Sequence, residues 1–154
     1  MIRFREAQEH EGELISHLAL ESKAYWNYSE EFLQACVEVL TIDAQYIKDN
    51  YVFVLEEEDD IVGFFALVTG EETRLDFLFI HPKFIGQGFG SLLWQYIVIK
   101  AKELGIKSFI IDSDPNAKAF YEKMGAVHIG ESPSRVLEDR RLPLMKMTIT
   151  ANGN

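Results

Sequence analysis

The sequence has few of the features that mark secreted or membrane proteins. Cys36 is the one cysteine in 154 residues, so an internal disulfide is excluded and a reducing, cytoplasmic location is expected. The longest apolar run, residues 61–68, is too short to span a bilayer. The first residues, MIRFREAQEHEG, are charged and unlike a secretion signal. We therefore expect a cytoplasmic protein that has no membrane partner.

Basic residues are also scarce, because lysine and arginine together number 15 against 25 acidic residues, which gives a net charge of −10. Binding to nucleic acid depends heavily on basic contacts to phosphate, so no nucleic-acid partner is expected. The acidity mildly favours a cationic substrate, although it is also a common means of solubility. No metal site is expected, because metal-ligand spacing is missing from the four histidines, His10, His17, His81 and His128.

Residues 80–93, IHPKFIGQGFGSLL, are the most informative stretch, because an apolar strand leads through three alternating glycines into a helix. Gly86, Gly88 and Gly90 lack β-carbons, so backbone N–H groups can approach an anion closely. The first turn of the following helix adds unpaired N–H donors and a partial positive charge. The segment therefore predicts a phosphate site.

Glycine-rich turns have several interpretations. A Walker loop requires Gly-Lys-Ser/Thr, whereas Gly90 is followed by Ser91 and Leu92, so that interpretation fails. A Rossmann turn has G-x-G-x-x-G spacing and an acid about twenty residues later. Asp112 lies at about that distance, so this alternative is weak but open. A tight strand-to-helix turn without a ligand also stays open.

Two segments together resemble a known family. Residues 80–93 resemble the pyrophosphate loop of the GNAT superfamily of N-acetyltransferases, a strand followed by x-P-x-x-R/Q-G-x-G-x-G/A and a helix. Residues 114–126, DPNAKAFYEKMGA, resemble the family's second signature, N-x-x-A-x-x-F-Y-x-x-x-G-F/A. The resemblance is strong over residues 52–126. One departure is Ile85, which replaces the usual Arg or Gln and removes a polar contact to pyrophosphate, so cofactor affinity could be lower.

The resemblance implies an α/β (α+β) fold in a single acetyltransferase domain over residues 1–154. Its sheet would be mixed and mostly antiparallel, with one parallel strand pair splayed around a coenzyme A crevice and helices on both faces. Hydrophobic periodicity predicts a compatible order of elements. The expected strands are 2–5, 51–55, 61–68, 73–80, 108–113, 127–130 and 142–149, and the expected helices are 9–20, 30–40, 89–104 and 117–124.

The resemblance further implies acetyl-CoA as cosubstrate. Pantetheine would lie along the end of the strand that finishes at Phe79 and Ile80, and Asn116 would contact its arm. The expected cofactor contacts are Phe79, Ile80, Gln87, Gly88, Phe89, Gly90, Ser91, Asn116 and Tyr121.

Acetyl transfer to an amine needs a base, because a lysine-like amine lies roughly three to four pK units above neutrality and its neutral form costs about 4–5 kcal/mol. Asp76 is the first candidate, since it shares strand parity with Leu78 and Ile80; the alternative is an ion pair with Arg74 or a solvated strand end. Asp112 is the second candidate, and a water relay remains open.

The leaving thiolate needs only a weak proton donor. Tyr121 matches the family position for this role, and its alternative is a core aromatic. The backbone N–H groups near Phe79 and Ile80 are the expected oxyanion donors.

The binding site for the acceptor amine is the part of the site that the sequence defines least. Trp26 and Tyr28, within 23–28, KAYWNY, could flank an amine by cation–π contact, but packing of two helices explains them equally well. Arg140 or Arg141 could reach the acceptor crevice, although surface charge is the other role.

The expected function is transfer of an acetyl group from acetyl-CoA to a primary amine of a small molecule or peptide. Two alternatives stay open: a non-catalytic acyl-CoA-binding sensor or partner-binding module, and a protein for another phosphate-bearing ligand. The sequence does not fix the oligomeric state, so a homodimer stays open.

Overall fold

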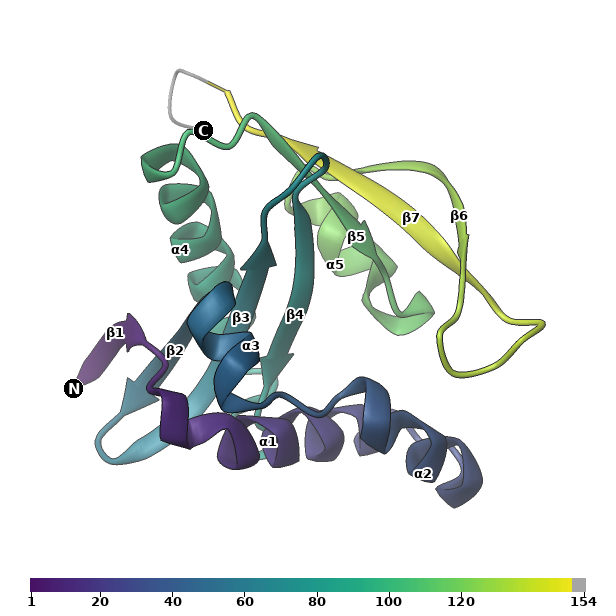
Figure 1. The fold of residues 1–154 in the computed structure, drawn as a ribbon, viewed down its shortest axis with the longest axis horizontal. Helices are drawn as coiled ribbons and strands as arrows, with labels where there is room; N and C mark the ends of the chain where they lie inside the picture. Colours follow the sequence, from purple (N-terminus) through teal and green to yellow (C-terminus); the bar gives the residue numbers. More distant parts are fainter. Residues whose placement is uncertain (151–154) are drawn as a thin grey trace.

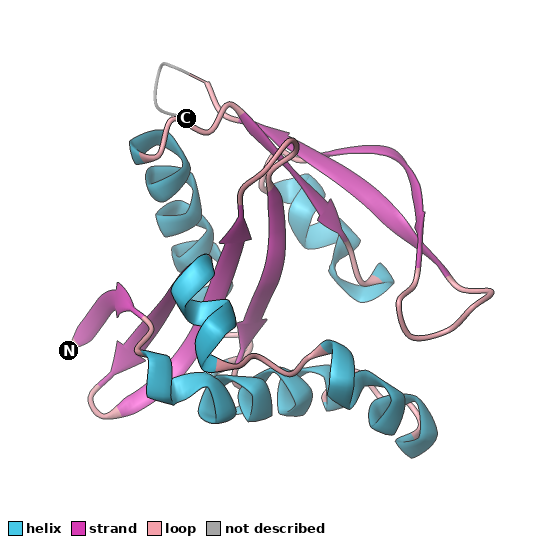
Figure 2. Cartoon of the chain, viewed as in Figure 1, coloured by secondary structure: helices cyan, strands magenta, loops and turns pink. Residues whose placement is uncertain are grey.

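The computed structural model describes residues 1–150, and within them seven strands form one sheet in the order β1-β2-β3-β4-β5-β7-β6 (Figures 1 and 2). Neighbouring strands are antiparallel except for the parallel pair β4–β5. The prediction of a mixed, mostly antiparallel sheet with one parallel pair is confirmed. The strands are β1 Ile2–Glu6, β2 Tyr51–Glu57, β3 Asp60–Val68, β4 Arg74–Ile80, β5 Ser108–Asp112, β6 Val127–Pro133 and β7 Arg141–Thr148.

Helices cover both faces of the sheet, as predicted (Figure 1). One face carries α1 Gly12–Ala24, α2 Glu30–Val39 and α3 Ala44–Asp49, and the other carries α4 Phe89–Glu103 and α5 Lys118–Lys123. Short 3-10 turns occur at η1 Glu9–Glu11, η2 Pro82–Phe84 and η3 Pro115–Ala117. In the described part of the chain no helix is long and apolar enough to cross a bilayer.

The two faces bury separate cores. Along β2, Val52 and Val54 pack towards α1–α3, whereas Phe53 and Leu55 pack towards α4 and α5. A strand that is buried on both sides reads as a continuous apolar run rather than an alternating one. This burial explains why VFVL in β2 is continuously apolar.

Two helical predictions differ from the structure. The helix expected at 9–20 begins as the η1 turn and continues as α1 to Ala24. Helix α3 was not predicted, because six residues are too few to show a helical period. Its one sequence signal is Asp43, whose carboxylate accepts a hydrogen bond from the Tyr46 N–H at the helix start.

A β-bulge interrupts β4 at Asp76. Leu75 pairs with Leu67 and Phe77 pairs with Ala66, so Asp76 is the extra residue opposite them. The bulge shifts the alternation of side chains along the strand. Leu78 packs on the α4 side, whereas Asp76 bonds Tyr46 of α3 on the other side. The sequence predicted that the side chain of Asp76 lies on the same face of the sheet as those of Leu78 and Ile80, and this prediction is wrong.

The parallel pair β4–β5 diverges along its length (Figure 1). Within residues 1–150 its one register pair joins Arg74 to Ile110, near the start of β4. Beyond this pair the strands separate, with Ile80 and Asp112 at their far ends. The splayed crevice that the resemblance implies is therefore present.

Candidate functional site

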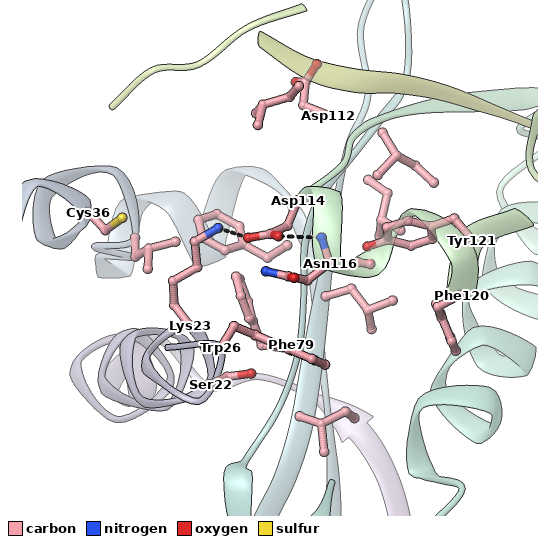
Figure 3. Close-up of a pocket in the computed structure, with 18 of the residues that line it drawn as sticks. Ser22, Lys23, Trp26, Cys36, Phe79, Asp112, Asp114, Asn116, Phe120 and Tyr121 are labelled. Carbon is pink, nitrogen blue, oxygen red and sulfur yellow. Dashed lines mark hydrogen bonds and ion pairs between the residues drawn. The ribbon is translucent and has the colours of Figure 1, made fainter. Parts of the chain in front are cut away.

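A cavity of about 520 Å³ opens between the splayed strands. Its lining comes from β4, α5, the loop before α4, the α1–α2 segment and the β6–β7 hairpin. Figure 3 shows the cavity with Cys36 and Lys23 on one side of Asp114 and Phe120 and Tyr121 on the other. The loop before α4 contributes Ile85, Gly86 and Gly88 to the wall, and the first turn of α4 contributes Gly90 and Ser91.

The glycine turn has the conformation that its sequence predicted. Gly86 and Gly88 have φ angles of 85° and 86°, and Gly88 is the N-cap of α4. These left-handed conformations strain any residue with a β-carbon. The first-turn N–H groups of α4 have no intrahelical acceptor, so they are available to an anion.

Two residues that were expected to contact the cofactor do not line the cavity. The Gln87 side chain donates a hydrogen bond of 3.1 Å to the carbonyl of Lys83. The Phe89 ring packs edge-on against Phe84, with 5.8 Å between ring centroids. Only the backbones of Gln87 and Phe89 are therefore candidates for ligand contact, whereas Phe79 and Ile80 line the cavity.

Asp76 lines the cavity, and its side chain is 13% exposed. Oδ2 accepts a hydrogen bond of 2.5 Å from the Tyr46 hydroxyl, and Oδ1 lies 3.5 Å from Nη2 of Arg135. Burial, reinforced by the neighbouring Asp76 carboxylate, raises the pKa of Tyr46, so its hydroxyl remains a donor. Asp76 is thus an oriented carboxylate with Oδ1 facing an exposed arginine.

The second candidate base, Asp112, has both oxygens in contacts. It pairs with the Arg74 guanidinium and accepts a hydrogen bond of 2.7 Å from Ser132. Arg74, which was considered as a partner for Asp76, pairs with Asp112 instead. These contacts join β4, β5 and β6 and favour a structural role for Asp112.

Tyr121 lies in the core of the α4–α5 face and reaches the cavity from α5. Its ring packs against Trp94 and Phe120, at 5.8 and 5.6 Å between centroids. The hydroxyl makes no hydrogen bond within residues 1–150, yet no described side-chain oxygen is both fully buried and unbonded. The hydroxyl is therefore exposed to the cavity. Burial, followed by the Asp114 charge, raises the pKa of Tyr121 and keeps it protonated.

Asp114 organises a polar network in the middle of the cavity (Figure 3). It forms an ion pair with Lys23 and accepts hydrogen bonds from the Tyr28 hydroxyl, at 2.9 and 2.8 Å, and from the Asn116 N–H. Although burial opposes ionisation, Lys23 and these hydrogen bonds hold the pKa of Asp114 below its usual value. Asp114 therefore stays ionised.

The two residues expected at the acceptor have different positions. Trp26 lines the cavity and is 45% exposed. The Tyr28 ring packs 4.5 Å from that of Phe32, and its hydroxyl accepts hydrogen bonds from Asn116 and Arg140. Tyr28 does not line the cavity, so the structure places it behind the wall.

Sequence reasoning gave no role to four residues that shape the site. Of the two arginines that were considered for the acceptor crevice, Arg140 lines the cavity and Arg141 does not. Asp114 was noted only as the first residue of a motif. Asp114 precedes Pro and Asn, a turn signal that predicts an aspartate capping the next N–H groups. The missed residues are Lys23, Tyr46, Asp114 and Arg135.

Residues 1–150 hold no group of three or more His, Cys, Asp or Glu side chains arranged to bind a metal ion.

Known proteins resemble this chain in sequence and in fold. The family model for the acetyltransferase (GNAT) domain matches residues 7–151. The peptidyl-lysine N-acetyltransferase YjaB of Salmonella typhimurium is 31% identical over 134 residues, which cover 86% of this chain and 88% of that protein.

Two solved structures show the same fold at low sequence identity. A GCN5-related N-acetyltransferase from Rhodopseudomonas palustris has a TM-score of 0.78 at 18% identity, covering 96% of this chain and 94% of that one. The PaiA N-acetyltransferase from Thermoplasma acidophilum, solved with coenzyme A, has a TM-score of 0.73 at 17% identity, covering 96% and 99%. Since the family model spans most of the sequence, this chain belongs to the GNAT acetyltransferase family and is an acyltransferase.

Proposed function

We propose that this protein transfers an acetyl group from acetyl-CoA to a primary amine by direct attack. One observation carries the proposal: a single cavity runs from the glycine turn past the Tyr121 hydroxyl to the Asp76 carboxylate. An anion site, a proton donor and a carboxylate are what a phosphate-bearing thioester and an amine require.

The residues present fit coenzyme A. The left-handed turn at Gly86 and Gly88 and the N-terminus of α4 offer backbone N–H donors to a pyrophosphate. The β4 edge near Phe79 and Ile80 lies beyond the one register pair with β5, so its backbone groups are available to the amides of a pantetheine arm. Bound there, acetyl-CoA supplies an activated thioester.

Asp76 accepts the proton of the attacking amine, directly or through a water molecule, in this proposal. Tyr46 fixes the carboxylate at the β4 bulge, and Oδ1 remains on the side of the exposed Arg135. A positioned base contributes typically 10²–10⁴-fold to a rate. Backbone N–H groups near Phe79 and Ile80 stabilise the oxyanion.

Tyr121 donates its proton to the leaving thiolate. Its raised pKa keeps the hydroxyl protonated, and its hydroxyl faces the cavity without a protein partner in the described chain. Asn116, whose amide bonds Tyr28, lies beside it in the cavity wall (Figure 3).

The acceptor has two candidate classes, a small-molecule amine and the side chain of a peptide lysine. The name of the Salmonella relative, a peptidyl-lysine N-acetyltransferase, favours the second. The experiment is a thiol-release assay with acetyl-CoA and a panel of small amines and lysine peptides. We expect thiol release that depends on an acceptor amine.

A thermal-shift series with acetyl-CoA, coenzyme A and nucleotides accompanies this assay. A ligand at 100 times its dissociation constant stabilises the folded state by about 2.7 kcal/mol. Stabilisation by acetyl-CoA with no turnover of any amine would favour a non-catalytic sensor. Stabilisation by nucleotides alone would overturn the assignment of coenzyme A.

A further inference from the structure

The cavity holds one cation without a carboxylate partner. Within residues 1–150, the charged side chains of the lining form three ion pairs, Lys23–Asp114, Arg74–Asp112 and Arg135–Asp76, the second of which uses Arg74 from β4. The guanidinium of Arg140 also lines the cavity, and no described carboxylate lies within 4.0 Å of it.

The Arg140 guanidinium is nevertheless held in a fixed position. Its Cζ lies 5.3 Å from the centroid of the Tyr28 ring and 4.8 Å from that of Phe32. Nη2 donates a hydrogen bond of 3.0 Å to the Tyr28 hydroxyl. Arginine has five N–H donors in a planar fork, so most of them remain for a ligand. A half-buried guanidinium prepared in this way suits a carboxylate, which it can bind with two parallel hydrogen bonds.

Apolar side chains surround Arg140 on the side away from the Tyr28 hydroxyl and the Lys23–Asp114 ion pair. Phe32, Cys36, Val39, Leu40 and Val136 line this part of the cavity. Burial raises the pKa of the Cys36 thiol more than Lys23 and Arg140 lower it, so the thiol is neutral. A ligand that binds here therefore meets the Arg140 guanidinium between these apolar side chains and the Lys23–Asp114 ion pair, whose two charges offset each other.

Arg140 lies away from the turn that would hold the pyrophosphate. Phe120 packs against Gly90 of that turn, since a β-carbon on Gly90 would lie 3.4 Å from the Phe120 ring. Figure 3 places Phe120 on the opposite side of Asp114 from Cys36 and Lys23, which are the neighbours of the Arg140 site. The free cation therefore belongs to the acceptor half of the cavity.

We propose that Arg140 binds a carboxylate of the acceptor, which is a small amine with a carboxylate and an apolar body, as in the larger apolar amino acids. The inference rests on the proposed function and chooses the small-molecule class of acceptor, because Arg140 lies in the cavity of this chain, over the peptide lysine that the name of the Salmonella relative favours. One unpaired guanidinium matches a single negative charge, which a carboxylate supplies and a phosphate dianion exceeds. The amine then lies towards Asp76, and the apolar body lies against Phe32 and Cys36.

The test compares leucine and phenylalanine with their carboxamides in the thiol-release assay. The carboxamide removes the negative charge without changing shape, and it lowers the amine pKa, so at neutral pH it is intrinsically no less reactive. We expect the wild type to acetylate the acids with a KM about 10- to 100-fold below that of the amides. Equal KM values for acid and amide, or acetylation of lysine peptides alone, would overturn the inference and leave the proposed function standing.

The matched variants are Arg140→Met and Arg141→Met, which remove the same charge from adjacent residues. Arg141 is exposed and does not line the cavity. Arg140→Met should raise the KM of the acids about 10- to 100-fold and leave that of the amides within about twofold. Arg141→Met should change neither. Arg140→Lys keeps a charge but loses the fork, so it should restore part of the affinity for the acids.

Two further measurements distinguish the loss of acceptor binding from misfolding and from a lack of turnover. The dissociation constant of coenzyme A and the melting temperature show whether Arg140→Met is folded, and both should match the wild type. Calorimetric titration of leucine and phenylalanine into the coenzyme A complex reports acceptor binding without turnover. Binding that is lost in Arg140→Met supports the inference even when no amine is acetylated, and binding that is unaffected by the substitution contradicts it.

Discussion

The Tyr46 hydroxyl donates a hydrogen bond of 2.5 Å to Oδ2 of Asp76, and this bond connects helix α3 to the bulge in β4. The Tyr46 ring also packs edge-on against Phe77, the next residue of β4. The hydroxyl stays protonated because burial and the Asp76 charge raise the pKa of Tyr46. Tyr46 therefore fixes one oxygen of the proposed base, and the other oxygen lies 3.5 Å from Nη2 of the exposed Arg135, which an incoming amine would have to displace or share.

Replacement of Asp76 with Asn tests the proposed base. We expect kcat/KM to fall about 10²-fold at neutral pH, because the amine then loses its proton acceptor. Part of the loss should be recovered as the pH rises towards the pKa of the acceptor, where deprotonation no longer limits the rate. The measurement is the ratio of mutant to wild-type kcat/KM across pH.

The matched control is Asp112→Asn, which removes a carboxylate held by Arg74 and Ser132. It should lower the melting temperature and leave the shape of the pH profile unchanged. A flat ratio for Asp76→Asn between about pH 7 and 10 would reassign deprotonation to Asp112 or to solvent.

Tyr46→Phe tests whether the hydroxyl positions Asp76. The phenyl ring keeps its packing, so only one hydrogen bond is lost, and we expect kcat/KM to fall about 3- to 10-fold. A merely structural role would lower the melting temperature without changing the pH dependence. The ratio of mutant to wild-type kcat/KM across pH decides, because a loss that diminishes towards the pKa of the acceptor marks a role in deprotonation.

Tyr121→Phe tests the proposed proton donor. The hydroxyl has no hydrogen-bond partner in residues 1–150, so its removal should leave stability and coenzyme A affinity unchanged. We expect kcat to fall about 10- to 100-fold. Because the pKa of Tyr121 is raised, the wild type should show no alkaline loss of activity from this group below about pH 10. A kcat within about twofold of wild type would leave Tyr121 a packing role alone.

Gly88→Val and Gly70→Val form a matched pair for the glycine turn. A β-carbon would meet no atom within 4 Å at either position, but only Gly88 of the two has a positive φ, of 86°. A β-branched residue there is strained by about 1–3 kcal/mol, which should displace the turn. We expect at least a roughly tenfold weaker binding of coenzyme A for Gly88→Val. Calorimetry measures it, and equal affinity in both variants would refute the loop assignment.

An ion-pair cluster around Arg5 is expected to make the stability of the fold depend on pH in the acid range. Arg5 bonds Glu11 at 2.9 and 2.8 Å and Glu56 at 2.6 Å, linking β1 to β2 and to η1. Hydrogen bonds from Arg5 lower the pKa of both carboxyl groups. A lowered pKa stabilises the fold above the unfolded value, about 4.3, and this contribution is lost as the pH falls below it.

We therefore expect the melting temperature to fall below about pH 4.3 and Glu11→Gln to show a shallower fall. At neutral pH the free energy of unfolding of this variant should be lower by about 1–3 kcal/mol. The melting temperature should fall by about 2–4 °C for each kcal/mol. Glu138→Gln is the control, because Glu138 is exposed and forms no ion pair in the described chain. Parallel pH curves for Glu11→Gln and the wild type would contradict the role of this cluster.

The order of strands and helices was predictable because apolar periodicity and two glycine-rich motifs are local properties of the sequence. The turn at Gly86 and Gly88, with φ angles of 85° and 86°, has conformations that favour glycine, so its position could be read from the sequence. The side of the sheet on which Asp76 lies was not predictable, because one bulged residue reverses the alternation and leaves no local signal.

Contacts between distant segments were also beyond the reach of the sequence. Lys23 and Asp114 are 91 positions apart, and Arg140 and Tyr28 are 112 apart. Such pairs depend on how α1, the start of η3 and the β6–β7 hairpin meet around the cavity. A single sequence shows that these residues are charged or aromatic, but it does not show which of them form ion pairs or hydrogen bonds with one another.

The divergence of β4 from β5 divides the seven-stranded sheet into two parts, β1–β4 and β5–β7–β6. In the described chain the backbone pair Arg74–Ile110 and the Arg74–Asp112 ion pair join them at one end. Further along the crevice the two parts are joined by side chains, through the ion pairs Asp76–Arg135 and Lys23–Asp114. We therefore expect the width of the crevice to depend on residues such as Arg74 that hold the two parts together without contacting a substrate.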